Sequence, residues 1–117
     1  MKTSLLAGIA VTTAALALPG ATLARAQAPR ATTVRVTAKD FAFVLSPKTV
    51  PHGQVTFVIT TASPATHDFA IAGRTSKTIG ARATTRLTVT LKPGSYSYRC
   101  TIDSHAQLGM KGMLKVT

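Results

Sequence analysis

Apolar and polar side chains alternate along much of this chain, and the alternation limits the fold more than any other feature of the sequence. In residues 33–39, valine and alanine occupy every second position, with arginine, threonine and lysine between them. Residues 86–91 repeat the pattern with leucine and valine, and residues 95–100 repeat it with tyrosine and Cys100. A period of two is typical of strands with one buried face. Beyond residue 30 no stretch has the period of a helix, so we expect an all-β domain.

Turn-forming pairs separate these runs, among them Ser46-Pro47, His52-Gly53 and Pro93-Gly94. Residues 74–83 favour no single structure. Several short strands at close spacing indicate a β-sandwich or a barrel. The predicted strands are 33–39, 41–45, 54–61, 67–71, 86–91, 95–100 and 113–116.

The first residues are typical of a secretory signal peptide. Lys2 supplies a positive charge, residues 5–18 are apolar or small, and small residues flank Arg25 and Gln27 at two candidate cleavage positions. We expect a signal peptide over residues 1–28 and one domain over residues 29–117. A retained amphipathic helix and an uncleaved membrane anchor are the alternatives. Cleavage would leave no membrane span, and the protein would be periplasmic or extracellular; an uncleaved signal would leave it tethered.

The length of 117 residues excludes a multidomain enzyme, and the net charge is +11. Loss of Lys2 and Arg25 with the signal peptide would leave 12 basic residues against three aspartates. These basic residues are scattered singly, so we expect no nucleic-acid partner. A basic surface is suited to steering an acidic protein partner.

The candidate chemistry lies near the C-terminal end. Cys100, His105 and Met110 follow one another with four residues between each pair, and His67 follows a predicted turn. A thiolate, imidazoles and a thioether suit copper and suit calcium or magnesium poorly. The single Cys excludes an intramolecular disulfide, and in an exported protein it indicates intermolecular pairing, a reactive thiol or a metal ligand.

Each of these residues also has an ordinary structural interpretation. Cys100 and Met110 would be buried apolar residues, and His105 would be a surface residue of a loop. Their joint occurrence favours a metal site. We expect His52, in a Pro-His-Gly turn, to be exposed, and Met113 to pack in the core rather than compete with Met110.

Over roughly residues 33–117 the chain resembles the cupredoxins, small blue copper proteins that include plastocyanin, azurin and amicyanin. The resemblance is carried by Phe41-Ala42-Phe43, residues 53–57, His67-Asp68-Phe69, and the C-terminal Cys100, His105 and Met110. It implies a Greek-key β-sandwich of seven to eight strands. It also implies one copper per chain, cycling between Cu(I) and Cu(II), with His67, Cys100 and His105 as ligands and Met110 as the weak axial ligand.

By the same resemblance the protein is a monomeric one-electron carrier between redox partner proteins, and not an enzyme. Electrons would leave through His105, inside an apolar patch of Ala106, Leu108 and Gly109. Asp68 stands where many members have Asn, and Ser104 where many have Gly. Asp68 is either a solvated residue or a tie between the segment of His67 and the loop of Cys100.

Two other functions are considered for the same sequence. A copper carrier or chaperone would have the same four ligands and would deliver the metal. A copper-free interaction module is disfavoured because all four ligand types are present. Multicopper enzymes need histidine-rich second sites, and the sequence has only three His and no His-x-His pair.

Overall fold

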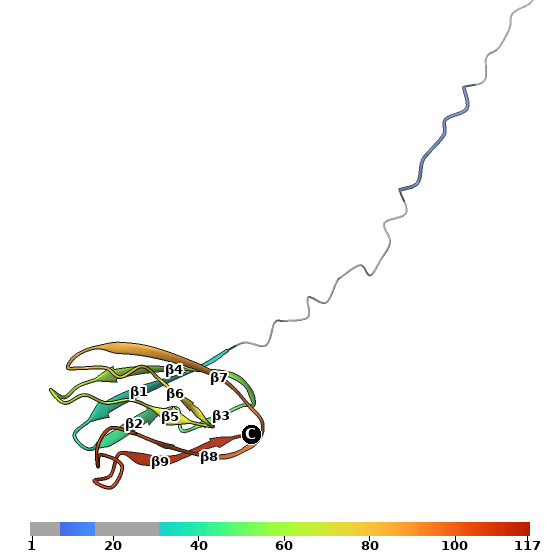
Figure 1. Cartoon of the computed structure of the whole chain (residues 1–117). Helices are drawn as coiled ribbons and strands as arrows, with labels where there is room; N and C mark the ends of the chain where they lie inside the picture. Colours follow the sequence, from blue (N-terminus) through green and yellow to red (C-terminus); the bar gives the residue numbers. More distant parts are fainter. Residues whose placement is uncertain (1–7, 16–30) are drawn as a thin grey trace, which may run out of the picture.

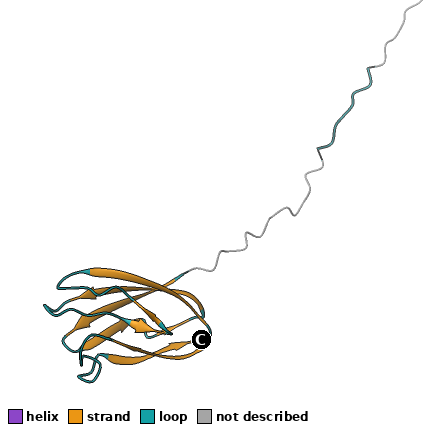
Figure 2. Ribbon diagram, in the orientation of Figure 1, coloured by secondary structure: helices purple, strands orange, loops and turns teal. Residues whose placement is uncertain are grey.

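The computed structural model describes residues 8–15 and 31–117, and the described part of the chain has strands and loops but no helix (Figures 1 and 2). Most of the predicted signal peptide, residues 1–28, lies outside the described residues, and the cleavage stays a prediction. Within the two described ranges, no helix is long and apolar enough to cross a membrane.

Within residues 8–15 and 31–117, nine strands form two sheets, which confirms the all-β sandwich. One sheet has the order β2-β1-β4-β7, and the other has the order β3-β9-β8-β5-β6. The strands are β1 Thr32–Lys39, β2 Ala42–Ser46, β3 Thr49–Val50, β4 Gly53–Thr61, β5 Ala70–Ile71, β6 Arg74–Thr75, β7 Thr84–Leu91, β8 Gly94–Arg99 and β9 Lys111–Val116.

The strand count exceeds the predicted seven to eight because β3 and β6, which have only two residues each, were not predicted. Two residues are too few to produce a period. The predicted strand 67–71 is a strand only at Ala70–Ile71. The last strand begins at Lys111 rather than Met113.

The long strands carry the core on their inward faces. β1 and β4 run parallel, with Val34 opposite Phe57 and Val36 opposite Ile59, and all four side chains are buried. β7 pairs with β4 in the antiparallel sense, and its alternate leucines and valine face the same interior. The period of two in the sequence therefore corresponds to the buried face of one sheet.

Aromatic rings occupy the end of the core nearest the candidate ligands. Phe69 packs against Phe57, Phe43 and Tyr98, with ring centroids 5.0–5.4 Å apart. A smaller cluster contains Ala38, Cys100 and Met110, and Phe43 packs against both clusters. The chemistry-bearing residues therefore lie on the same packed interior as the rest of the sandwich.

The chain crosses repeatedly from one sheet to the other. The β1–β2 turn and the β8–β9 loop, which each connect neighbours in one sheet, and the segment between β4 and β5, which crosses between the sheets, lie at one end of the sandwich (Figure 1). His67 and Cys100, 33 residues apart, meet at this end. The topology thus assembles the site.

Candidate metal centre

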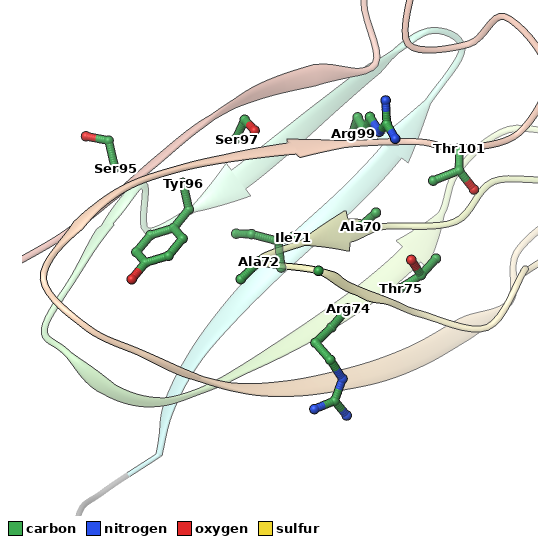
Figure 3. A pocket seen from close by; sticks show the side chains of 11 residues that line it. Ala70, Ile71, Ala72, Arg74, Thr75, Ser95, Tyr96, Ser97, Arg99 and Thr101 are labelled. Carbon is green, nitrogen blue, oxygen red and sulfur yellow. The ribbon is translucent and has the colours of Figure 1, made fainter.

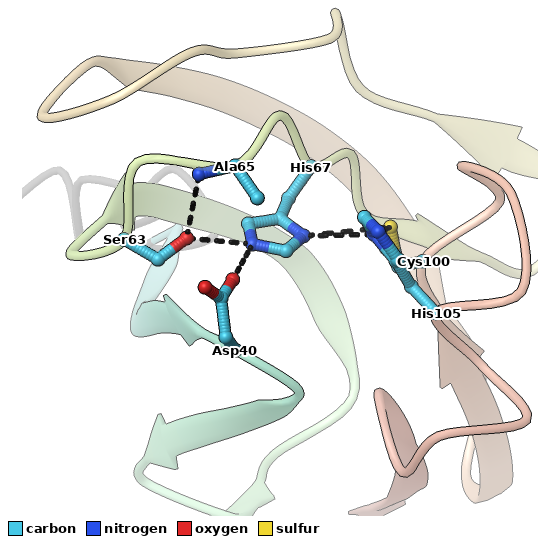
Figure 4. A network of polar contacts seen from close by, with 6 residues as sticks. All are labelled: Asp40, Ser63, Ala65, His67, Cys100 and His105. Carbon is cyan, nitrogen blue, oxygen red and sulfur yellow. Dashed lines mark hydrogen bonds and ion pairs between the residues drawn. The ribbon is translucent and has the colours of Figure 1, made fainter.

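The backbone of His67 is fixed by an isolated bridge. Its N–H donates to the carbonyl of Ile79 at 3.0 Å, and the N–H of Ile79 donates back at 2.8 Å. The side chain has no exposed surface. Figure 4 shows one edge of the ring turned toward Cys100 and His105, and the other toward Asp40 and Ser63. Contacts at both edges of the ring therefore fix the orientation of His67.

Cys100 follows the last residue of β8, and the loop after it folds back on itself. The N–H of Cys100 donates to the carbonyl of Met110 at 3.0 Å. The N–H of Met110 donates to the carbonyl of His105 at 3.1 Å. Main-chain hydrogen bonds therefore connect the three residues that the sequence spacing singled out.

Three potential ligand atoms converge. Nδ1 of His67 and Nδ1 of His105 are 3.2 Å apart, and Sγ of Cys100 lies 4.0 Å and 3.7 Å from them, respectively. With bonds of about 2.0 Å to nitrogen and about 2.3 Å to sulphur, a trigonal site separates nitrogen from sulphur by roughly 3.7 Å. The three atoms are therefore spaced to hold one metal ion.

Met110 is fully buried and belongs to the small cluster with Cys100 and Ala38. The structure thus brings together His67, Cys100, His105 and Met110, as predicted. This set of imidazole, thiolate and thioether donors is suited to one copper ion. His52 is exposed, as expected, and its Nδ1 lies 2.9 Å from the carbonyl oxygen of Thr117, outside the cluster.

The expectation for Met113 was wrong. Its side chain is 57% exposed and lines a hollow with Ala106 and Lys111. In β9 the inward positions belong to Leu114 and Val116, and Met113 pairs with Ser97 of β8, which is exposed. The prediction began this strand two residues too late, at Met113 itself, and so gave no alternation from which its face could be assigned.

Burial changes the chemistry of the thiol. Cys100 is 2% exposed, and desolvation is the largest cause that raises its pKa above the usual value. The negative charge of Asp68 acts in the same direction. Without a cation beside it, Cys100 is therefore held in the protonated form, and a metal ion would replace that proton.

Asp68 ties the two ligand segments together, as one of its two interpretations predicted. It is 3% exposed, and its Oδ1 accepts a hydrogen bond from the N–H of Thr101 at 2.6 Å. Its Oδ2 accepts a short hydrogen bond from the hydroxyl of the same residue. Asp68, which follows His67, thus fixes the position of Thr101, which follows Cys100.

Asp40 and Ser63 were missed by the sequence analysis. Asp40 Oδ1 and Ser63 Oγ lie 3.0 Å and 2.9 Å from Nε2 of His67 (Figure 4). A hydrogen bond from Ser63 is the largest cause that lowers the pKa of Asp40, and His67 acts in the same direction. The one signal in the sequence was the scarcity of acidic residues: with only three in the chain, each was a candidate for a specific contact.

The surface near the site is partly apolar. His105 is partly buried, and the ring of Phe41 packs on it with centroids 5.0 Å apart. Phe41 and Leu108 are 37% and 57% exposed. The expected patch around His105 therefore includes Phe41, which comes from the β1–β2 turn.

A hollow of about 570 Å³ opens on the outer face of β5, β6 and β8 (Figure 3). Arg74 and Arg99 contribute the charged side chains, and none of the residues that line it is Cys, His or Asp. The converging ligand atoms lie outside this hollow, so it takes no part in the metal centre.

Comparison with known proteins agrees with this geometry. A sequence profile described as the cupredoxin-like domain matches residues 8–116. A search of curated proteins found no significant match.

Among solved structures, auracyanin A, a "blue" copper protein from Chloroflexus aurantiacus, is 21% identical with a TM-score of 0.64, covering 75% of this chain and 100% of its own. Auracyanin B is 22% identical with a TM-score of 0.65, covering 74% of this chain and 89% of its own. Dithionite-reduced auracyanin from Roseiflexus castenholzii is 25% identical with a TM-score of 0.59, covering 74% and 98%. These structures share the fold, and the profile match over most of the chain shows that it belongs to the cupredoxin-like family.

Proposed function

We propose that this protein is an exported type 1 copper protein that carries single electrons between redox partners, with His67, Cys100, His105 and Met110 as ligands. The observation that carries the proposal is the convergence of two imidazole nitrogens and one thiol sulphur within 4.0 Å. The family and the donor set support copper as the metal. Bound copper would supply a one-electron couple between Cu(II) and Cu(I).

The protein residues contribute mainly rigidity. His67 is held by its bridge to Ile79, and Cys100 and Met110 are joined by a main-chain hydrogen bond. Because packed side chains resist displacement, the ligand positions stay similar in both oxidation states. Small rearrangement favours fast electron transfer.

The burial of the ligand side chains also favours electron transfer over copper delivery. His67, Cys100 and Met110 have exposed fractions of 0%, 2% and 0%, so an acceptor protein has no direct access to them. A copper carrier needs ligands that an acceptor can replace one at a time. The observed burial therefore favours retention of the metal during turnover.

The partner surface is centred on His105. Phe41 and Leu108 supply exposed apolar area beside it, which suits the small interfaces of brief redox encounters. The excess of basic over acidic residues would attract an acidic partner at low salt. We expect a monomer acting in the periplasm or outside the cell.

Metal analysis of the purified protein tests the site. We expect one copper per chain and strong visible absorption from the Cys100 thiolate bound to Cu(II). Cys100→Ser should lose the colour and most of the copper. His52→Ala is the matched control, because His52 lies outside the cluster, and it should retain both. Retention of copper at the original affinity by Cys100→Ser would overturn the ligand assignment.

Repeated voltammetry with metal analysis after each cycle distinguishes an electron carrier from a copper carrier. An electron carrier should return to its initial absorption with copper still bound. Release of copper on reduction, at the rate of its appearance in an acceptor protein, would replace the electron-transfer proposal by a copper-delivery function.

A further inference from the structure

We infer that Asp40 is a positioning residue for His67 and that, together with Ser63, it lowers the reduction potential of the copper site. The inference rests on the proposed copper site. It extends that site to the β1–β2 turn, which follows Lys39 and supplies no ligand of its own.

The geometry on the far side of His67 defines the hydrogen-bond pattern. Nε2 lies 3.0 Å from Asp40 Oδ1 and 2.9 Å from Ser63 Oγ, while Nδ1 faces His105 and Cys100 (Figure 4). A carboxylate only accepts, so Nε2 must carry the proton and donate it toward Asp40. The tautomer assigned from this pattern leaves the lone pair of Nδ1 free for a metal.

Ser63 supports the carboxylate. Its Oγ accepts a hydrogen bond from the N–H of Ala65 at 3.2 Å, which holds the hydroxyl beside His67. The hydroxyl proton is then directed to Asp40, in agreement with the lowered pKa of that carboxyl. Asp40 from the β1–β2 turn and Ser63 from the segment between β4 and β5 thus form one network around Nε2.

The negative charge of Asp40 would stabilise bound Cu(II) more than bound Cu(I). A hydrogen bond from Nε2 to a carboxylate increases the electron density that the ring donates through Nδ1. Cu(II) gains more from a stronger donor and from a nearby negative charge than Cu(I) does. The carboxylate of Asp40 lies 3.0 Å from the ring nitrogen of His67 that faces away from the other ligand atoms. It therefore favours the oxidised state and lowers the potential.

Asp40→Asn tests the inference, because it removes the charge and nearly preserves the shape. Loss of a supporting residue costs about 10- to 100-fold in metal affinity. We expect the Cu(II) affinity to fall about tenfold relative to the Cu(I) affinity, which for one electron raises the potential by about 59 mV. Asp103→Asn is the control, because Asp103 is an exposed carboxylate of the β8–β9 loop, and it should shift the potential much less.

Ser63→Ala provides a second variant without a change of charge. We expect a smaller rise in potential than for Asp40→Asn. Nitrogen NMR of the metal-free protein gives a readout that needs no copper: His67 should carry its proton on Nε2 in the original protein, and that proton should exchange with water faster in Asp40→Asn.

The outcomes separate the two proposals. If the original protein binds no copper, the proposed function fails, and the NMR result still decides the tautomer of His67. If copper binds and Asp40→Asn leaves the potential unchanged, or shifts it no more than Asp103→Asn does, the role of Asp40 is wrong and the copper site stands. A proton found on Nδ1 of metal-free His67 would also overturn the inference.

Discussion

The carbonyl oxygen of Phe41 lies so close to Gly109 that a Cβ atom on Gly109 would be 2.9 Å from it. This contact joins the β1–β2 turn to the loop that carries His105 and Met110. Gly109 also has a φ of +124°, in the region that residues with side chains rarely adopt. The position is therefore restricted to glycine by both contact and conformation.

Gly109→Ala should destabilise the protein, because the new methyl group adds strain to an already unfavourable backbone conformation. We expect a loss of about 1–3 kcal/mol in the free energy of unfolding, measured by urea denaturation of the metal-free protein. Gly80→Ala is the control, because a Cβ there meets nothing within 4 Å. Equal stability of the two variants would contradict the close approach of Phe41.

Asp68→Ala should loosen the connection between the two ligand segments. The change removes a buried acceptor and leaves the N–H and hydroxyl of Thr101 without their partner. Hydrogen bonds to a charged group contribute about 1.5–3 kcal/mol each, so we expect at least that loss in the free energy of unfolding. Asp103→Asn, at an exposed carboxylate, should change it by less than about 0.5 kcal/mol. If the free energy of unfolding of Asp68→Ala fell no more than that of the control, Asp68 would not connect the two ligand segments.

Thr61→Val should stabilise the protein. Thr61 is 1% exposed, and its hydroxyl has no hydrogen-bond partner among the residues that the structure describes. Valine has nearly the same shape and removes the buried polar group, so we expect a gain of about 1 kcal/mol. Thr60→Val is the matched control, since the exposed hydroxyl of Thr60 lies 3.1 Å from that of Thr84, and it should bring no gain.

Metal-free Cys100 should react slowly with iodoacetamide. The thiolate is the reactive form, and burial both raises the pKa of Cys100 and shields it. The folded protein should react more slowly than the urea-unfolded protein, by about tenfold for each 1.4 kcal/mol needed to expose the thiol. Because the pKa is raised, the rate should level off at a higher pH in the folded state. Equal rates in both states would contradict the burial, and with one Cys in the sequence no other thiol competes.

The sequence by itself determined the long strands and the kind of chemistry. A strand with one face in the core must alternate apolar and polar residues, so β1, β7 and β8 could be predicted from the residue types at every second position. The spacing of Cys100, His105 and Met110 was readable for a similar reason, because all three belong to one segment of the chain.

Only the tertiary structure decided what surrounds His67. Asp40 and Ser63 come from the β1–β2 turn and the segment after β4, 27 and four residues away from it. No local pattern marks Asp40, whose partner is distant in sequence, since that contact exists only after the chain has folded. Ser63 is near His67 in sequence, but it lies in an irregular segment where no period indicates which side chains meet. The two-residue strands and the outward face of Met113 were hidden for the same reason: pairing with a neighbouring strand defines them, and that pairing is a property of the folded chain.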